Sequence, residues 1–147
     1  FNFIKLEHKK FLDEKYQKEK DYKCYKDLTE KQTRIKIANN YYAEKYYNIM
    51  LSDKYGFKLY DRKIEKVGND KIELMDLYKD KTMFAVKIGK SSGKLCYVVD
   101  QSQQAIVSYK HNLVDHMPEI DKVALWIILD RKNKLNIKDG KPDINNI

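Results

Sequence analysis

A loop of small and basic residues, Gly89-Lys90-Ser91-Ser92-Gly93-Lys94, offers a place for phosphate chemistry. A phosphate loop of the Walker type needs a glycine five residues before its Gly-Lys-Ser/Thr element, and Phe84 stands there instead. The stretch is therefore not a Walker loop. Small residues at a helix start still present free backbone N–H groups to a phosphate. We expect nucleic-acid contacts from four residues of this loop: Lys90, Ser91, Ser92 and Lys94.

The histidines and cysteines are not spaced for a zinc site or a disulfide framework. His111 and His116 are five residues apart, which keeps them off a common helix face, and His8 stands alone. Cys24 lies in a charged stretch and Cys96 in a distant apolar one. We expect structural or surface roles for the histidines, and two free thiols in a reducing cytoplasm.

The chain is basic, and almost entirely through lysine. Its 147 residues hold 30 Lys or Arg against 22 Asp or Glu, a formal charge of +8. A positive field attracts DNA or RNA, although the abundance of Lys, Asn, Ile and Tyr is also what an AT-rich genome encodes. No apolar run approaches the roughly 18 residues of a membrane span, and no secretory signal is visible. We therefore expect a cytoplasmic protein with no membrane partner.

The elements that position these residues follow from hydrophobic periodicity. Apolar positions from Phe3 to Tyr16 predict a charged N-terminal helix. A capping box at Thr29 and Gln32 predicts the start of one long helix over about 30–54, which Gly56 ends. A four-tyrosine cluster on this helix (41, 42, 46 and 47) is predicted to pack in the core and at its rim. Three strands of a meander follow, over about 57–61, 72–77 and 83–88.

The second half predicts a helix and then a strand. The spacing from Leu95 to Tyr109 suits a helix, although Cys96–Val99 alone suits a strand. The apolar run 123–129 predicts a strand covered on both faces, in the middle of a sheet. We expect an α/β core domain over 29–135, with a central mixed sheet flanked by helices. A charged helical segment (1–28) precedes it, and a truncated tail (136–147) follows. Segments of a longer polypeptide are its expected partners.

This αβββαβ order, with one extra N-terminal helix, resembles the core of the restriction-endonuclease-like, or PD-(D/E)XK, nuclease superfamily. The resemblance implies an acid on the second strand and an acid-x-lysine on the third, which hold Mg²⁺ and assist the attacking water. Asp76 and Lys87 match two of these positions, and Gln101 matches a glutamine that many members carry after the lysine strand. Position 85 departs from the motif because it is alanine. Glu73 or Glu44 would have to join Asp76 as a metal ligand.

A second resemblance is more local. The segments Glu73–Tyr78, Phe84–Gly89 and Lys94–Ser102, with Leu59-Tyr60-Asp61-Arg62-Lys63 before them, resemble a sporadically distributed bacterial family of uncharacterised proteins. Members of that family are much longer and often lie near mobile-element or defence genes. The resemblance implies that this chain is a C-terminal part of such a protein. It implies no particular activity.

The leading prediction is a nucleic-acid-directed domain of a bacterial defence or mobile-element protein. It is either a Mg²⁺-dependent nuclease or a degenerate descendant. One alternative is a non-catalytic nucleic-acid-binding domain that ignores metal. The other is a protein-interaction or oligomerisation module that docks through its N-terminal helix. Structural roles also stay open for single residues: Asp76 can cap a strand, and Lys87 and Glu44 can be solvated surface groups.

Overall fold

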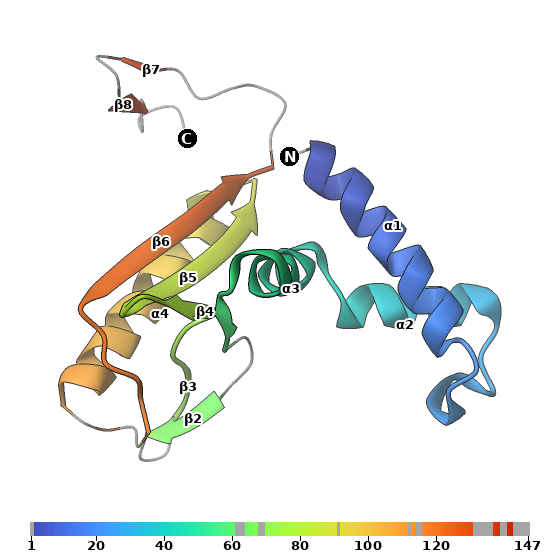
Figure 1. The fold of residues 1–147 in the computed structure, drawn as a ribbon, viewed down its shortest axis with the longest axis horizontal. Helices are drawn as coiled ribbons and strands as arrows, with labels where there is room; N and C mark the ends of the chain where they lie inside the picture. The colour runs from blue at the N-terminus through green and yellow to red at the C-terminus, as the bar shows by residue number, and fades with distance from the viewer. Residues whose placement is uncertain are drawn as a thin grey trace.

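The computed structural model describes residues 2–60, 64–67, 70–90, 92–111, 113, 116–130, 137–138 and 141–142. In this part of the chain the protein is α/β (Figure 1), as the sequence predicts. Its helices are α1 (Asn2–Glu19), a 3₁₀ turn η1 (Lys23–Tyr25), α2 (Glu30–Asn40), α3 (Ala43–Tyr55) and α4 (Ser92–Lys110). Its strands are β1 (Lys58–Leu59), β2 (Ile64–Val67), β3 (Asp70–Glu73), β4 (Leu77–Lys79), β5 (Thr82–Gly89), β6 (Lys122–Leu129), β7 (Ile137–Lys138) and β8 (Lys141–Pro142). No described helix is long and apolar enough to cross a membrane.

The main sheet is mixed and has the order β1-β4-β5-β6. β1 pairs with β4 and β4 with β5 in antiparallel fashion, as in the predicted meander. The bounds of its second strand are wrong, because residues 72 and 73 belong to β3 in a separate two-stranded sheet and only Leu77 of the predicted 72–77 lies in β4. β5 and β6 are parallel over their whole length, from Thr82↔Lys122 to Gly89↔Leu129. Parallel neighbours need a long crossover, and α4 supplies it. α4 is thus a helix, as the spacing from Leu95 to Tyr109 predicts.

The first two strands of the meander each come in two pieces. From Lys58 to Ile64 the chain advances six residues, whereas their pairing partners Tyr78 and Glu73 are five apart. The two pairings therefore differ in register by one residue. Asp76 lies at this break, where its backbone N–H still donates to Phe84 O (3.0 Å). A register break is a common way to turn a side chain out of a regular ladder.

The prediction of one helix over 30–54 is wrong, because the chain breaks it at Tyr41 and Tyr42. Tyr41 has φ −123° and ψ 53°, and Tyr42 is extended at φ −62° and ψ 162°. The predicted capping box at Thr29 and Gln32 is confirmed. Both helices pack against α1, but only α3 also packs against β5. The break thus comes where the packing neighbours change, which fits tertiary contacts that outweigh local helix propensity.

The break is held by aromatic packing against α1. The Nε2 atom of His8 lies 2.6 Å from the Tyr41 carbonyl oxygen, and the His8 ring stacks on Tyr46. Phe11 packs against both tyrosine rings. The Tyr41 hydroxyl donates to Glu19 Oε1 (2.8 Å), and burial together with this carboxylate raises the pKa of Tyr41 to about 12. These contacts confirm packing roles for Tyr41 and Tyr46, and a structural role for His8.

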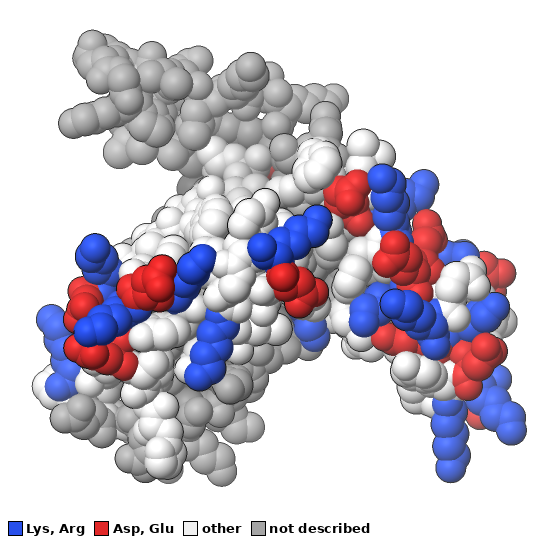
Figure 2. Space-filling view, viewed as in Figure 1, with Lys and Arg blue, Asp and Glu red and all other residues white. Residues whose placement is uncertain are grey.

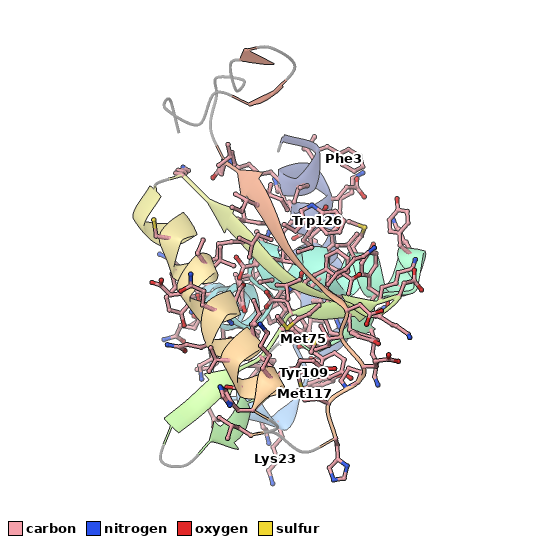
Figure 3. All side chains as sticks on the ribbon, turned by 90° about the vertical axis from the view of Figure 1, so that its left-hand side faces the viewer. Phe3, Lys23, Met75, Tyr109, Met117 and Trp126 are labelled. Atoms are coloured by element: carbon pink, nitrogen blue, oxygen red, sulfur yellow. The ribbon has the colours of Figure 1, made fainter. Side chains whose placement is uncertain are left out.

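Side chains alternate between the two faces of the sheet. On the α3 face, Leu51 packs with Leu77 and Val86, and partly buried aromatic rings extend this core: Tyr47, Phe57, Phe84 and Trp126. On the α4 face, Met83 packs with Met75 and Ala105. Figure 3 shows Met75, Tyr109 and Met117 close together along α4. The Tyr109 hydroxyl also accepts a hydrogen bond from the Ile120 N–H (3.0 Å), which ties the segment before β6 to α4.

The prediction of a central last strand is wrong within the described part of the chain. β6 stands at the edge of the main sheet, paired only with β5 among the described strands. Trp126 and Ile128 pack on the α3 face. The alternate residues Val123, Leu125 and Ile127 are 37%, 43% and 40% exposed. This second face of β6 is therefore only partly covered, although α4 contacts the strand.

Candidate functional site

The candidate site lies along the edge of β5 beyond the end of β4. Asp76 Oδ2 accepts a hydrogen bond from the Val86 N–H (2.6 Å), and Glu44 Oε2 accepts one from the Ile88 N–H (3.0 Å). N–H groups two residues apart on a strand point to the same edge, about 6.6 Å from one another. The two carboxylates are thus neighbours that replace the missing strand partner of β5.

Lys87 projects between these two hydrogen-bonded positions. Its Nζ lies 3.1 Å from Glu44 Oε1, and the side chains of the pair are only 26% (Lys87) and 13% (Glu44) exposed. Burial lowers the pKa of Lys87, but the negative charges of Glu44 and Asp76 raise it by more, so the pKa lies above its usual value of 10.5. Lys87 is consequently a fixed cation at physiological pH.

Asp76 reaches the site from a buried position, since only 6% of it is exposed. Asp76 directly precedes Leu77, which pairs with Phe84, and the Asp76 N–H donates to the same Phe84 carbonyl. Ala85 and Lys87 share a face of β5 by the strand period. Ala85 is itself 2% exposed. The second carboxylate of the site comes instead from Glu44 at the start of α3.

The third predicted metal ligand, Glu73, lies beside Gln101 of α4. Gln101 Nε2 lies 3.4 Å from the Glu73 carbonyl oxygen and 3.5 Å from its Oε2. Among the described residues, no three His, Cys, Asp or Glu side chains form a group that could hold a metal ion. Glu44, Glu73 and Asp76 therefore do not form one ligand cluster, whereas Glu44, Asp76 and Lys87 do converge.

The predicted phosphate loop is described only in part. Lys90 is exposed and lies 3.6 Å from Asp130, which also pairs with Lys5 of α1 (3.0 Å). The two lysines outweigh burial and lower the pKa of Asp130. Ser91 and the side chains of Ser92 and Lys94 lie outside the described residues. Both cysteines are free and exposed, as predicted.

Two residues beside the site escape sequence reasoning. Tyr97 on α4 is 60% exposed, and its ring centroid lies 5.9 Å from Lys87 Nζ. Asn48 on α3 is fully buried one turn after Glu44. A signal for Asn48 exists in retrospect: it is a polar residue, disfavoured inside helices, on the face that Leu51 turns to the core.

In the view of Figure 2, lysines, arginines and acidic residues mix over α1 and α2. Ion pairs there include Arg34 with Asp13 (2.9 Å) and with Glu30 (2.8 Å). The net charge of +8 is thus partly compensated locally. We therefore expect specific side chains at the site, more than a broad basic surface, to recognise a ligand.

Comparisons with protein-family models, with curated proteins and with solved structures found no match. The residues at the β5 edge nevertheless fit a divalent cation. Carboxylate oxygens are the hard donors that Mg²⁺ prefers, and Mg²⁺ is commonly held by one or two carboxylates together with water and substrate phosphates. Glu44 and Asp76 supply such a pair beside a fixed cation.

Proposed function

We propose that this chain is a divalent-metal-dependent nuclease domain with a restriction-endonuclease-like arrangement of helices and strands. One observation carries the proposal: Glu44 of α3 contacts both Lys87 Nζ and the Ile88 N–H, at the β5 edge where Asp76 binds the Val86 N–H. A second carboxylate thus stands beside the lysine although position 85 is alanine. The element order, the Asp76 and Lys87 positions and the basic charge support the same proposal.

Each side chain has a role that its environment favours. Glu44 and Asp76 would hold Mg²⁺, which supplies an activated water and charge compensation at a phosphodiester. Lys87 remains protonated and offers its positive charge to the developing charge on the phosphate oxygens. Glu44 and the strand backbone fix the position of Lys87. Gln101 and the exposed Tyr97 ring lie on the α4 side, where they can contact the nucleic acid.

The test is cleavage of labelled single- and double-stranded DNA and RNA with Mg²⁺ or Mn²⁺. We expect Glu44→Gln to lower the cleavage rate about 10- to 100-fold, because the amide loses the charge that binds metal and holds Lys87. The matched control is Glu14→Gln, which changes an exposed carboxylate on α1 and should leave the rate unchanged.

Other outcomes of this assay point to other functions. Salt-sensitive binding without cleavage, equal with and without divalent metal, would indicate a non-catalytic nucleic-acid-binding domain. Metal-dependent cleavage that Glu44→Gln leaves intact would show that Glu44 is not a metal ligand. Asp76 would then be the only carboxylate that the proposed site offers beside Lys87.

A second candidate function, self-association, is favoured by β6. Its outer edge pairs with no other described strand, and its exposed face is apolar at Val123, Leu125 and Ile127. Two copies of β6 paired antiparallel about Leu125 would place each Val123 opposite an Ile127 and Leu125 opposite itself. Such a two-fold contact completes the ladder and buries all three side chains.

We expect light scattering to show a concentration-dependent shift toward the mass of a dimer, and Leu125→Lys to remain a monomer. Two lysines directly opposite one another would repel across the paired strands. The control is Val107→Lys on α4, an equally exposed apolar residue (52%) outside β6. A wild-type protein that stays monomeric at high concentration contradicts self-association.

A further inference from the structure

Asn48 is the most unusual buried group near the site. It is 0% exposed, and neither its amide nitrogen nor its amide oxygen has a hydrogen-bond partner among the described residues. Leaving a buried amide unpaired destabilises the fold, because the group loses its hydrogen bonds to water and gains none in the protein. Most buried polar side chains in folded proteins are paired, so one that is not calls for a specific reason.

The position of Asn48 on α3 brings it to the β5 edge. Residues 44, 48 and 51 follow the helical spacing of one face. Glu44, at one end of this row, binds the Ile88 N–H, and Leu51, at the other end, packs on Leu77 and Val86. Asn48 stands between them and therefore faces the stretch of β5 from Val86 to Ile88.

The carboxylate of Asp76 lies at this same stretch, because its Oδ2 is bound to the Val86 N–H. Neighbouring residues four apart on a helix have Cβ atoms about 5–6 Å from one another, which puts Asn48 within side-chain reach of Glu44. The buried amide lies one turn from Glu44, on the side of α3 whose Leu51 packs on Val86, the residue whose N–H binds Asp76. It is an independent observation, since it plays no part in the contacts that define the site.

We propose that the side-chain oxygen of Asn48 is the third protein oxygen ligand of the divalent cation held by Glu44 and Asp76. The inference rests on the function proposed above and deepens it. An amide oxygen is a hard, neutral donor that suits Mg²⁺ and Mn²⁺. A neutral ligand here avoids placing a third buried carboxylate beside Glu44 and Asp76, where like charges would repel. Asn48 would thus supply an oxygen ligand in addition to the two carboxylates, which the alanine at position 85 cannot do.

The experiment is calorimetric titration of the protein with Mn²⁺, together with its melting temperature in metal-free buffer. Asn48→Leu is nearly isosteric and removes both unpaired polar atoms. We expect it to weaken Mn²⁺ binding about tenfold while the metal-free melting temperature holds or rises. Asn48→Asp adds a charged oxygen in the same place, and we expect it to tighten Mn²⁺ binding while lowering the metal-free melting temperature.

Two controls separate this inference from the proposed function. Thr33→Val also replaces a buried polar residue by an apolar one of its size, in α2, and should leave Mn²⁺ affinity unchanged. Glu44→Gln should weaken Mn²⁺ binding in any case. If Glu44→Gln weakens binding while Asn48→Leu and Asn48→Asp both bind Mn²⁺ as the wild type does, Asn48 is only a packing residue and the proposed function survives. Absence of saturable Mn²⁺ binding to the wild type overturns both.

Discussion

Asp76→Asn is expected to lower metal-dependent cleavage about 1000-fold. Asparagine has the size of aspartate, and its amide oxygen can still accept the hydrogen bond from the Val86 N–H. The substitution therefore removes one negative charge with little change of shape. That charge is needed to attract a divalent cation to the β5 edge, and losing one preorganised charged group at a reacting centre typically costs 10²–10³ in rate. Single-turnover cleavage under saturating Mn²⁺ measures the effect.

The control for this change is Asp53→Asn, which removes an exposed carboxylate from the same helix as Glu44. It should cleave at the wild-type rate. The near-ultraviolet circular dichroism of Asp76→Asn should match that of the wild type, which separates a lost ligand from a lost fold. Cleavage within threefold of the wild-type rate, in a folded Asp76→Asn protein, would falsify the role of Asp76 as a metal ligand.

The order of the elements could be predicted because each segment keeps one hydrophobic period. The alternation at 57–61 and 83–88 predicts β1 and β5, and the helical spacing up to Tyr109 predicts α4. The predicted strand 72–77 instead overlaps β3 and reaches β4 only at Leu77. The break between α2 and α3 could not be predicted. No proline or glycine marks it, and what changes there is the set of packing neighbours, since both helices contact α1 and α3 also contacts β5.

The last strand shows the limit of reading burial from composition. A run such as Val123–Leu129 is apolar on both faces, and the sequence interpretation places it between two covering layers. In the described structure one face packs under α3 and the other is about 40% exposed at Leu125 and Ile127. The residue type alone does not show whether an apolar face is covered by another part of the same chain or by a second molecule.

The candidate site was only partly accessible to sequence reasoning. Asp76 and Lys87 follow from strand position, and Glu44 entered because the alanine at position 85 required another acid. Sequence spacing could not choose between Glu44 and Glu73, since the choice depends on where α3 begins. The extended Tyr42 starts α3 at Ala43, one residue before Glu44, and the Glu44 carboxylate binds the Ile88 N–H. The break between α2 and α3, which could not be predicted, therefore positions Glu44 at the candidate site.

Lys87→Met is expected to lower cleavage at least 100-fold, because it removes the fixed cation next to the two carboxylates. Methionine retains much of the length and volume of the lysine stem, so packing against Tyr97 should change little. The carboxylates that surround Lys87 raise its pKa above 10.5, so the lysine stays charged from pH 6 to pH 9. The ratio of wild-type to variant rates should hence be constant over that range. A ratio that rises or falls tenfold between pH 6 and pH 9 would mean that Lys87 exchanges a proton during the reaction.

The same substitution should lower the free energy of unfolding by about 1–2 kcal/mol at pH 7, a value discounted from that of a fully buried pair because Lys87 is 26% exposed. A lysine whose pKa is raised on folding contributes stability that is fully present below the pKa of the unfolded chain. That contribution is lost as pH rises through the higher pKa of the folded state. The stability difference between wild type and variant, measured by urea unfolding, should thus be constant up to about pH 10 and shrink above it.

The control is Lys54→Met, which replaces an exposed lysine on α3 and should show neither the rate loss nor this pH dependence. Equal losses in the two variants would contradict the special position of Lys87, because they would reflect only the removal of one positive charge.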